Sequence, residues 1–172
     1  VLKSYFIQAD AVQSPKRKIT GRKNLDFSNT QKLKTLSPEE TFNLGLEISE
    51  HLSSGDVIAL IGELGAGKTL LTTGICRGLG FQGEVTSPSY IHVQTYVGPV
   101  TIHHIDLYLD RSEEEVYDLG IDEMFDSDSI VIVEWADSFP NLMPNNCWQI
   151  EIRWTDEGET VRDILIKPKP VI

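Results

Sequence analysis

Cysteine is scarce in this chain of 172 residues, and long apolar runs are missing. Cys76 and Cys147 are its two cysteines, and neither sits in a CxxC or CxxH spacing. The sequence therefore favours two reduced thiols over a disulfide or a metal site. No apolar run approaches the roughly 20 residues that cross a bilayer, and no signal-peptide pattern opens the chain. With 40% hydrophobic residues, the chain is predicted to form one globular domain of cytoplasmic type.

Positive charge is scarce outside the N-terminal segment. The net charge is −11, although residues 1–36 hold eight lysines and arginines against two aspartates, which leaves +6 there and −17 on the remainder. A strongly acidic body repels nucleic acid but can pair with a basic protein surface. The basic segment 1–36, which contains SPKRKITGRK, could contact RNA or serve as a targeting sequence. A flexible, solvated N-terminal extension is the favoured interpretation.

The pattern of residues 37–168 predicts an α/β domain with mixed strand directions. A capping-box pattern at Ser37 and Glu40 begins a helix over 37–52, and the apolar segment 56–61 predicts a strand covered on both faces. The further predicted elements are a helix from Lys68 to Gly78, two strands around the turn at Gly98–Pro99, a helix over 112–125, a strand over 129–137 and a terminal hairpin formed by CWQIEIRW and TVRDILI.

Residues 62–69 read GELGAGKT and match the GxxxxGK[ST] pattern between a predicted strand and a predicted helix. Glycines allow successive backbone N–H groups to point at phosphate oxygens, and the helix beginning near Lys68 adds its positive end. Lys68 offers a cation to the outer phosphates, and the Thr69 hydroxyl is a hard oxygen ligand for Mg²⁺. The pattern predicts a nucleotide-phosphate site, rather than a glycine-rich turn that binds nothing, made by Gly62, Glu63, Leu64, Gly65, Ala66, Gly67, Lys68 and Thr69.

Two carboxylates close predicted strands and complete the set of candidate catalytic residues with Lys68. Glu134 ends SIVIVE and should emerge at the carboxyl edge of the sheet, where ligands bind in α/β folds. It could coordinate Mg²⁺ directly or through water, or orient the attacking water; the alternative is a carboxylate that faces solvent. Asp106, at the end of TIHHID, is the second candidate, with the same alternative.

Several polar and aromatic residues have open roles. His103 and His104 are adjacent on a predicted strand, so they face opposite sides, and buried or hydrogen-bonded histidines are favoured over ligands of one metal. Thr86, in the stretch TSPS, could place a hydroxyl at the γ-phosphate as part of a switch loop, or lie in an ordinary turn. Trp135 is either a core aromatic or a flat surface beside the nucleotide or a partner.

The motifs GELGAGKT, TSPSY, HIDLY, YDLGIDEMF and IVIVEWAD, in this order and spacing, resemble the TsaE (YjeE) family of small P-loop ATPases from bacterial tRNA threonylcarbamoyladenosine synthesis. The resemblance runs from about Ser37 to Ile166. It implies a P-loop NTPase-like mixed sheet flanked by helices, with an antiparallel hairpin insertion. It also implies ATP and Mg²⁺ as cofactors, Thr69 and Glu134 on the metal side, and Glu39 and Val161 as weaker candidates near the base or sugar.

The same resemblance implies partners. The TsaD and TsaB proteins form the heterodimer that transfers the threonylcarbamoyl group to the tRNA adenosine next to the anticodon, and this chain would be its ATP-driven accessory subunit. Two positions depart from the family pattern, because Thr73 and Leu109 stand where arginine is usual. With no obvious arginine finger or catalytic glutamine beside the loop, we expect slow hydrolysis without partners.

Two other classes of function remain open at this point. A small-molecule or nucleoside kinase would use the same loop, but such enzymes normally carry an arginine-bearing lid, and Arg77 and Arg111 are the two arginines between residues 70 and 150. A nucleotide-gated binding module would bind ATP without releasing ADP and phosphate, even with all partners present.

Overall fold

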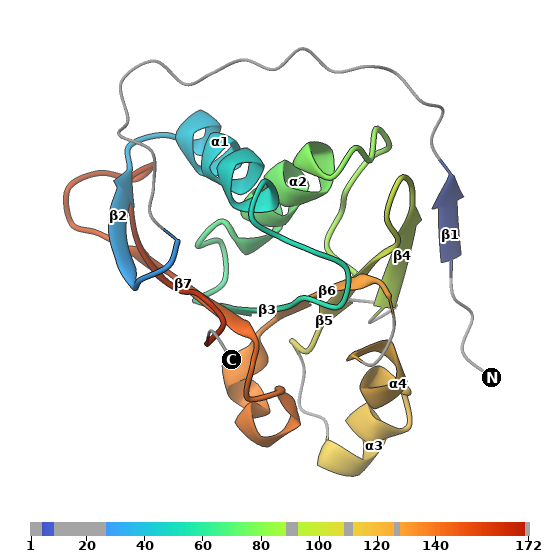
Figure 1. The fold of residues 1–172 in the computed structure, drawn as a ribbon. Helices are drawn as coiled ribbons and strands as arrows, with labels where there is room; N and C mark the ends of the chain where they lie inside the picture. The colour runs from blue at the N-terminus through green and yellow to red at the C-terminus, as the bar shows by residue number, and fades with distance from the viewer. Residues whose placement is uncertain (1–4, 9–26, 89–92, 109–111, 126–127, 171–172) are drawn as a thin grey trace.

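The computed structural model describes residues 5–8, 27–88, 93–108, 112–125 and 128–170 (Figure 1). Within these ranges, eight strands form one mixed sheet in the order β1-β4-β5-β6-β3-β7-β8-β2. The strands are β1 (Tyr5–Gln8), β2 (Gln31–Thr35), β3 (Val57–Ile61), β4 (Val93–Val97), β5 (Ile102–Asp106), β6 (Ile130–Glu134), β7 (Trp148–Trp154) and β8 (Arg162–Lys167). The helices are α1 (Pro38–Ser49), α2 (Lys68–Gly78), α3 (Glu113–Tyr117), α4 (Ile121–Phe125) and the 3₁₀ turns η1 (Ala136–Ser138) and η2 (Pro140–Leu142).

The centre of the sheet is parallel, and its outer parts are mostly antiparallel. β6 pairs in parallel with β5 and with β3, and β3 pairs in parallel with β7. β4 is antiparallel to β5, as the predicted hairpin insertion requires. β7 and β8 form the predicted C-terminal hairpin, and β2 extends it as a further antiparallel strand. The predicted α/β class and mixed sheet are therefore confirmed.

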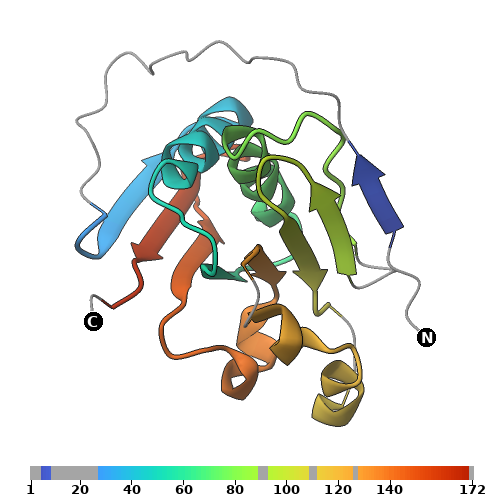
Figure 2. The ribbon, with the colours of Figure 1, turned by 45° about the vertical axis from the view of Figure 1, so that its right-hand side comes forward.

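Helices cover both faces of this sheet (Figures 1 and 2). On one face, α1 and α2 bury Leu44, Ile48, Leu71 and Ile75 against Ile58 and Ile132 of the central strands. On the other face, α3, α4 and the 3₁₀ turns bury Val116, Ile121 and Phe139 against Val57 and Val131. Because β3 and β6 are covered on both sides, their sequences are almost wholly apolar.

A glycine contact sets the distance between α1 and α2. A Cβ atom built on Gly74 would lie 2.1 Å from the backbone oxygen of Phe42 and 3.0 Å from the Cα atom of Gly45. The two helix backbones therefore touch at a point where no larger side chain fits. Since α2 begins at Lys68, this contact also fixes where the first turn of α2 lies relative to α1.

Three local expectations need correction. The helix predicted over 112–125 is two short helices, because Gly120 adopts a φ of +68° between them. The strand predicted over 129–137 ends at Glu134, because Trp135 takes a left-handed conformation with φ 61°. At α1, the Ser37 hydroxyl accepts from the Glu40 N–H as predicted, but the Glu40 carboxylate accepts from the N–H of Leu36, one residue before Ser37.

The folded sheet begins before Ser37. β2 lies inside the segment 1–36 and pairs with β8 over five residues, and β1 pairs in parallel with β4. Residues 1–4 and 9–26 lie outside the described ranges, so the expected flexibility of the extension stays a prediction. No helix in the described part of the chain has the length and hydropathy needed to span a membrane.

Candidate functional site

The GELGAGKT loop connects the carboxyl end of β3 to the first residue of α2. Gly67 is the N-cap of α2 and has φ 109°, a conformation that glycine adopts without steric cost. Because glycine has no side chain to cap the helix, the N–H groups of the first turn remain available to an anion. Within the loop, Ala66 is buried, whereas Leu64 is 70% exposed. The loop is therefore an open cradle of backbone donors.

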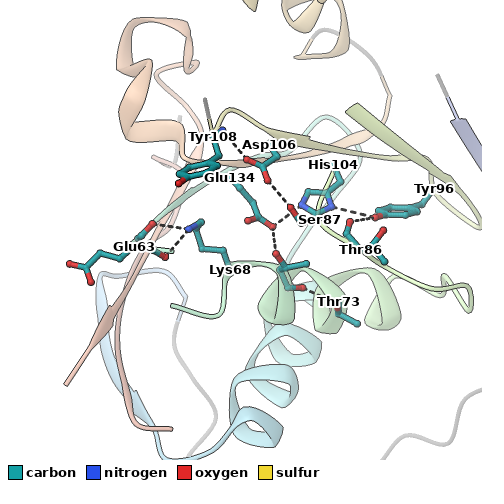
Figure 3. A network of polar contacts seen from close by, with 12 residues as sticks. Glu63, Lys68, Thr73, Thr86, Ser87, Tyr96, His104, Asp106, Tyr108 and Glu134 are labelled. Atoms are coloured by element: carbon teal, nitrogen blue, oxygen red, sulfur yellow. Dashed lines mark hydrogen bonds and ion pairs between the residues drawn. The ribbon is translucent and has the colours of Figure 1, made fainter. Parts of the chain in front are cut away.

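Lys68 folds over this cradle (Figure 3). Its ammonium group donates to the carbonyl oxygens of Gly62 at 2.7 Å and Glu63 at 3.0 Å, and it lies 3.8 Å from the centre of the Trp135 ring. Burial lowers the pKa of Lys68, while the nearby negative charges of Glu134 and Asp106 act in the opposite direction. The buried ammonium group is thus placed where an anionic ligand would stabilise its charge.

Thr69 and Glu134 meet at the carboxyl edge of the sheet. The Thr69 hydroxyl donates to Oε1 of Glu134 at 2.9 Å, and Glu134 itself is buried. Asp106 lies beside Glu134 because the two residues are register partners on β5 and β6. A hydroxyl and a carboxylate at this distance are hard oxygen donors, and Mg²⁺ characteristically takes one or two such protein ligands together with phosphate oxygens. The residues therefore fit Mg²⁺.

Asp106 is tied to the segment that contains the predicted switch residues (Figure 3). Its Oδ2 accepts from the Ser87 hydroxyl at 2.7 Å, and its Oδ1 accepts from the N–H of Tyr108 at 2.8 Å. The exposed Thr86 uses its carbonyl group, which accepts from the Tyr96 hydroxyl at 3.1 Å. Ser89 of the same stretch lies outside the described residues.

The two histidines face opposite sides of β5, as predicted. His104 is fully buried, and its Nε2 lies 2.9 Å from Oε1 of Glu134. His103 is half-buried and contacts the Thr95 hydroxyl at 3.0 Å through Nδ1, and burial lowers its pKa. Sequence reasoning did not predict that His104 contacts the carboxylate, because strand alternation alone does not identify the residue that a side chain meets.

Trp135 is a flat surface beside Lys68 and not a fully enclosed core residue. Its left-handed backbone turns the chain directly after Glu134, and its ring also packs 4.7 Å from the ring of Tyr108. The two remaining predicted residues, Glu39 and Val161, lie outside the loop, in α1 and between β7 and β8. Glu39 is exposed in the first turn of α1, and the carbonyl of Val161 accepts from Arg162 at 2.8 Å.

Arg162 is a residue of this region that sequence reasoning missed. Its Nε donates to the carbonyl of Ala66 at 2.9 Å, and its guanidinium group lies 3.6 Å from the centre of the Trp154 ring. No motif surrounds Arg162, so only the fold reveals that it reaches the loop. At the departures from the family pattern, the Thr73 hydroxyl donates to the backbone oxygen of Thr69, and Leu109 lies outside the described residues.

A GxxxxGKT loop between a parallel strand and a helix, with a carboxylate facing its threonine, defines the P-loop class of α/β proteins. Comparison with known proteins narrows the class. The family model described as threonylcarbamoyl adenosine biosynthesis protein TsaE matches residues 35–164. The chain belongs to the TsaE family, which confirms the resemblance found in its motifs.

Relatives and a solved structure support this assignment. The chain is 37% identical over 129 residues to the tRNA threonylcarbamoyladenosine biosynthesis protein TsaE of Bacillus subtilis, a match that covers 74% of this chain and 80% of the relative. It is 36% identical over 112 residues to the TsaE of Haemophilus influenzae, covering 64% and 71% of the two chains. The crystal structure of Bacillus subtilis YdiB superposes with a TM-score of 0.69 at 30% identity, covering 82% of this chain and 86% of that one.

Proposed function

We propose that this chain is a Mg²⁺-dependent ATPase that supports formation of N6-threonylcarbamoyladenosine in tRNA. The observation that carries the proposal is the meeting of Thr69 and Glu134 at 2.9 Å, beside the buried ammonium group of Lys68. This arrangement combines a phosphate cradle, a cation and a pair of hard oxygen donors at one edge of the sheet. Family membership supplies the biological context of the activity.

Each residue has a distinct task in this proposal. The N–H groups at the start of α2 bind phosphate oxygens, and Lys68 exchanges its two loop carbonyls for the outer phosphates. Thr69 and Glu134 would hold Mg²⁺, which would supply neutralisation of the phosphate charge. Asp106 accepts hydrogen bonds from Ser87, in the segment before β4, and from the N–H of Tyr108, just after β5, and thereby keeps both segments against the site.

The proposed partners are the TsaD and TsaB proteins, with tRNA reached through their complex. A net charge of −11 disfavours direct binding of this chain to tRNA. We therefore expect ATP turnover to be slow for the chain alone and to rise markedly when the heterodimer is added. The cytoplasm, where tRNA is modified, is the proposed location.

Two variants test the site. Lys68→Met should weaken binding of ATP, measured by calorimetry, because it removes the cation from the cradle. Glu134→Gln should retain most of the binding energy but reduce Mg²⁺-dependent release of phosphate by at least about tenfold, since it removes a charged metal ligand. Asp128→Asn is the matched control, because Asp128 is an exposed acid at the opposite end of β6.

The outcomes separate the classes of function. Wild-type affinity in Lys68→Met, or unchanged hydrolysis in Glu134→Gln, would refute the site assignment. ATP binding without release of ADP and phosphate, with the heterodimer present, would instead identify a nucleotide-gated binding module. Transfer of the phosphoryl group to a small molecule would identify a kinase.

A further inference from the structure

A buried chain of contacts joins the Thr86 carbonyl to the proposed metal ligand (Figure 3). The Tyr96 hydroxyl lies 3.1 Å from the oxygen of Thr86 and 3.3 Å from Nδ1 of His104, and Nε2 of the same ring lies 2.9 Å from Oε1 of Glu134. Tyr96 and His104 are both fully buried. Water therefore cannot replace a missing partner at the ring without a change in packing.

These contacts demand more hydrogens than neutral groups supply. Three contacts separate Thr86 from Glu134, whereas a neutral tyrosine and a neutral imidazole bring one hydrogen each. If Tyr96 donates to Thr86 and accepts from Nδ1–H, the bare Nε2 faces a carboxylate. If Tyr96 donates to Thr86 and the ring keeps its hydrogen on Nε2, the Tyr96 oxygen and Nδ1 face each other at 3.3 Å with no hydrogen between them. If Tyr96 donates to Nδ1, Nε2–H donates to Glu134 and the carbonyl of Thr86 loses this donor.

The exposure of the Thr86 carbonyl and of the Glu134 carboxylate, at the two ends of this chain of contacts, decides between these arrangements. Thr86 is exposed, so solvent can hydrate its carbonyl group when Tyr96 turns away. Glu134 is buried, so a lone pair of His104 directed at its carboxylate cannot be relieved by solvent. Two lone pairs that face each other between the buried Tyr96 and Nδ1 are likewise out of reach of solvent, so donation by Tyr96 to Nδ1 leaves the smallest penalty among the arrangements with a neutral ring.

We propose that His104 is a positioning residue for Glu134 and that Tyr96 links its tautomer to the Thr86 segment. The proposal rests on the role given above to Glu134. With Nε2–H as donor, His104 holds the Glu134 carboxylate toward Thr69. The Thr86 carbonyl competes for the Tyr96 hydrogen, so any contact that draws Thr86 away from Tyr96 strengthens the hold on Glu134.

The first test measures metal affinity in the presence of a non-hydrolysable ATP analogue, with Mn²⁺ as the probe in electron paramagnetic resonance titrations. His104→Leu should lower the affinity about tenfold or more, as expected when the partner of a metal ligand is lost. His104→Gln should restore it to within about threefold, because the glutamine amide can still donate to Glu134. His103→Leu, which changes the neighbouring residue on the other face of β5, should match the wild type.

Tyr96→Phe separates the link from simple packing. The phenyl ring keeps the packing but cannot donate to Nδ1, so His104 loses the contact that favours its hydrogen on Nε2. The Mn²⁺ affinity should fall below that of the wild type, by less than in His104→Leu. Wild-type affinity, or a loss as large as that in His104→Leu, would overturn the proposed link. Urea unfolding of every variant tests whether the folded state is retained, so that a loss of Mn²⁺ affinity is not attributed to unfolding.

A second readout needs no nucleotide. Long-range ¹H–¹⁵N spectra of the free protein should show the His104 hydrogen on Nε2 and none on Nδ1. A hydrogen on Nδ1 alone would overturn the positioning role of His104, and hydrogens on both nitrogens would overturn the link through Tyr96. If the wild type does not bind Mn²⁺ with the ATP analogue, the proposed function is refuted. If the wild type binds and the Mn²⁺ affinity of His104→Leu equals that of the wild type, only this inference is refuted.

Discussion

Replacement of Gly74 by alanine should force α1 and α2 apart. The added Cβ would lie 2.1 Å from the Phe42 oxygen and 3.0 Å from the Gly45 Cα, and both atoms belong to the backbone of α1. No side-chain rotation can relieve these contacts, so the helices must separate by roughly 1 Å to reach ordinary van der Waals distances. Overpacking of this kind costs about 1–3 kcal/mol, and the better helix propensity of alanine returns up to about 1 kcal/mol.

Because the 2.1 Å contact is with backbone that cannot turn aside, the overpacking cost lies at the upper end of this range, and the net expectation for Gly74→Ala is a loss of about 2 kcal/mol in the free energy of unfolding. Urea denaturation measures this loss, and nucleotide affinity should fall as well because α2 carries Lys68 and Thr69 in its first turn. Thr73→Ala is the control, since it changes the adjacent residue of the same helix and adds no atom. If Gly74→Ala unfolds within 0.5 kcal/mol of the wild type, a range typical of surface substitutions, the two backbones do not touch as described.

Two further predictions concern a buried thiol and the loop tether. Burial raises the pKa of the Cys76 thiol from 9.0 to about 12. Above pH 9 the unfolded chain loses this proton while the folded chain keeps it, so the contribution of Cys76 to stability is complete below pH 9 and is lost as the pH rises towards 12. In Cys76→Ala, the free energy of unfolding measured with urea should decline less between pH 9 and 12 than in the wild type. The same pH dependence in both proteins would contradict the burial argument. Arg162→Lys removes the fork that reaches the carbonyls of Ala66, Glu159 and Val161, so proteolysis within residues 155–161 should accelerate. Arg153→Lys is the control, because the guanidinium group of Arg153 contacts Glu151 and not the loop. Equal cleavage rates in the two variants would show that Arg162 does not hold residues 155–161 against the loop.

The central elements were predictable because their patterns are local. β3 and β6 are short apolar runs, and the loop between β3 and α2 carries its glycines, lysine and threonine within eight consecutive residues. Such patterns reflect burial on both faces of a sheet and the demands of phosphate binding, which act on neighbouring residues. The pairing of Thr69 with Glu134 followed from the rule that parallel strands end at one edge.

The remaining features depend on contacts between distant segments. β2 reads QKLKT, with a single apolar residue, and it is held by pairing with β8 and by ion pairs from Lys34 to Glu157 and Asp163. Arg162 reaches Ala66 across 96 residues of sequence. The break at Gly120 was missed because the acidic and apolar residues around it fit one helix as well as two. Local propensity carries little information about such choices, since tertiary packing decides them.

The ammonium group of Lys68 has a consequence for selectivity. Two carbonyl oxygens and the face of an indole already satisfy it, so a ligand gains only the difference between its own attraction and these contacts. A chloride ion, with one charge and one point of contact, would gain little from displacing them. A triphosphate would also engage the N–H groups at the start of α2 and would thereby recover the loss, so the contacts of Lys68 favour a chain of phosphates over a small anion.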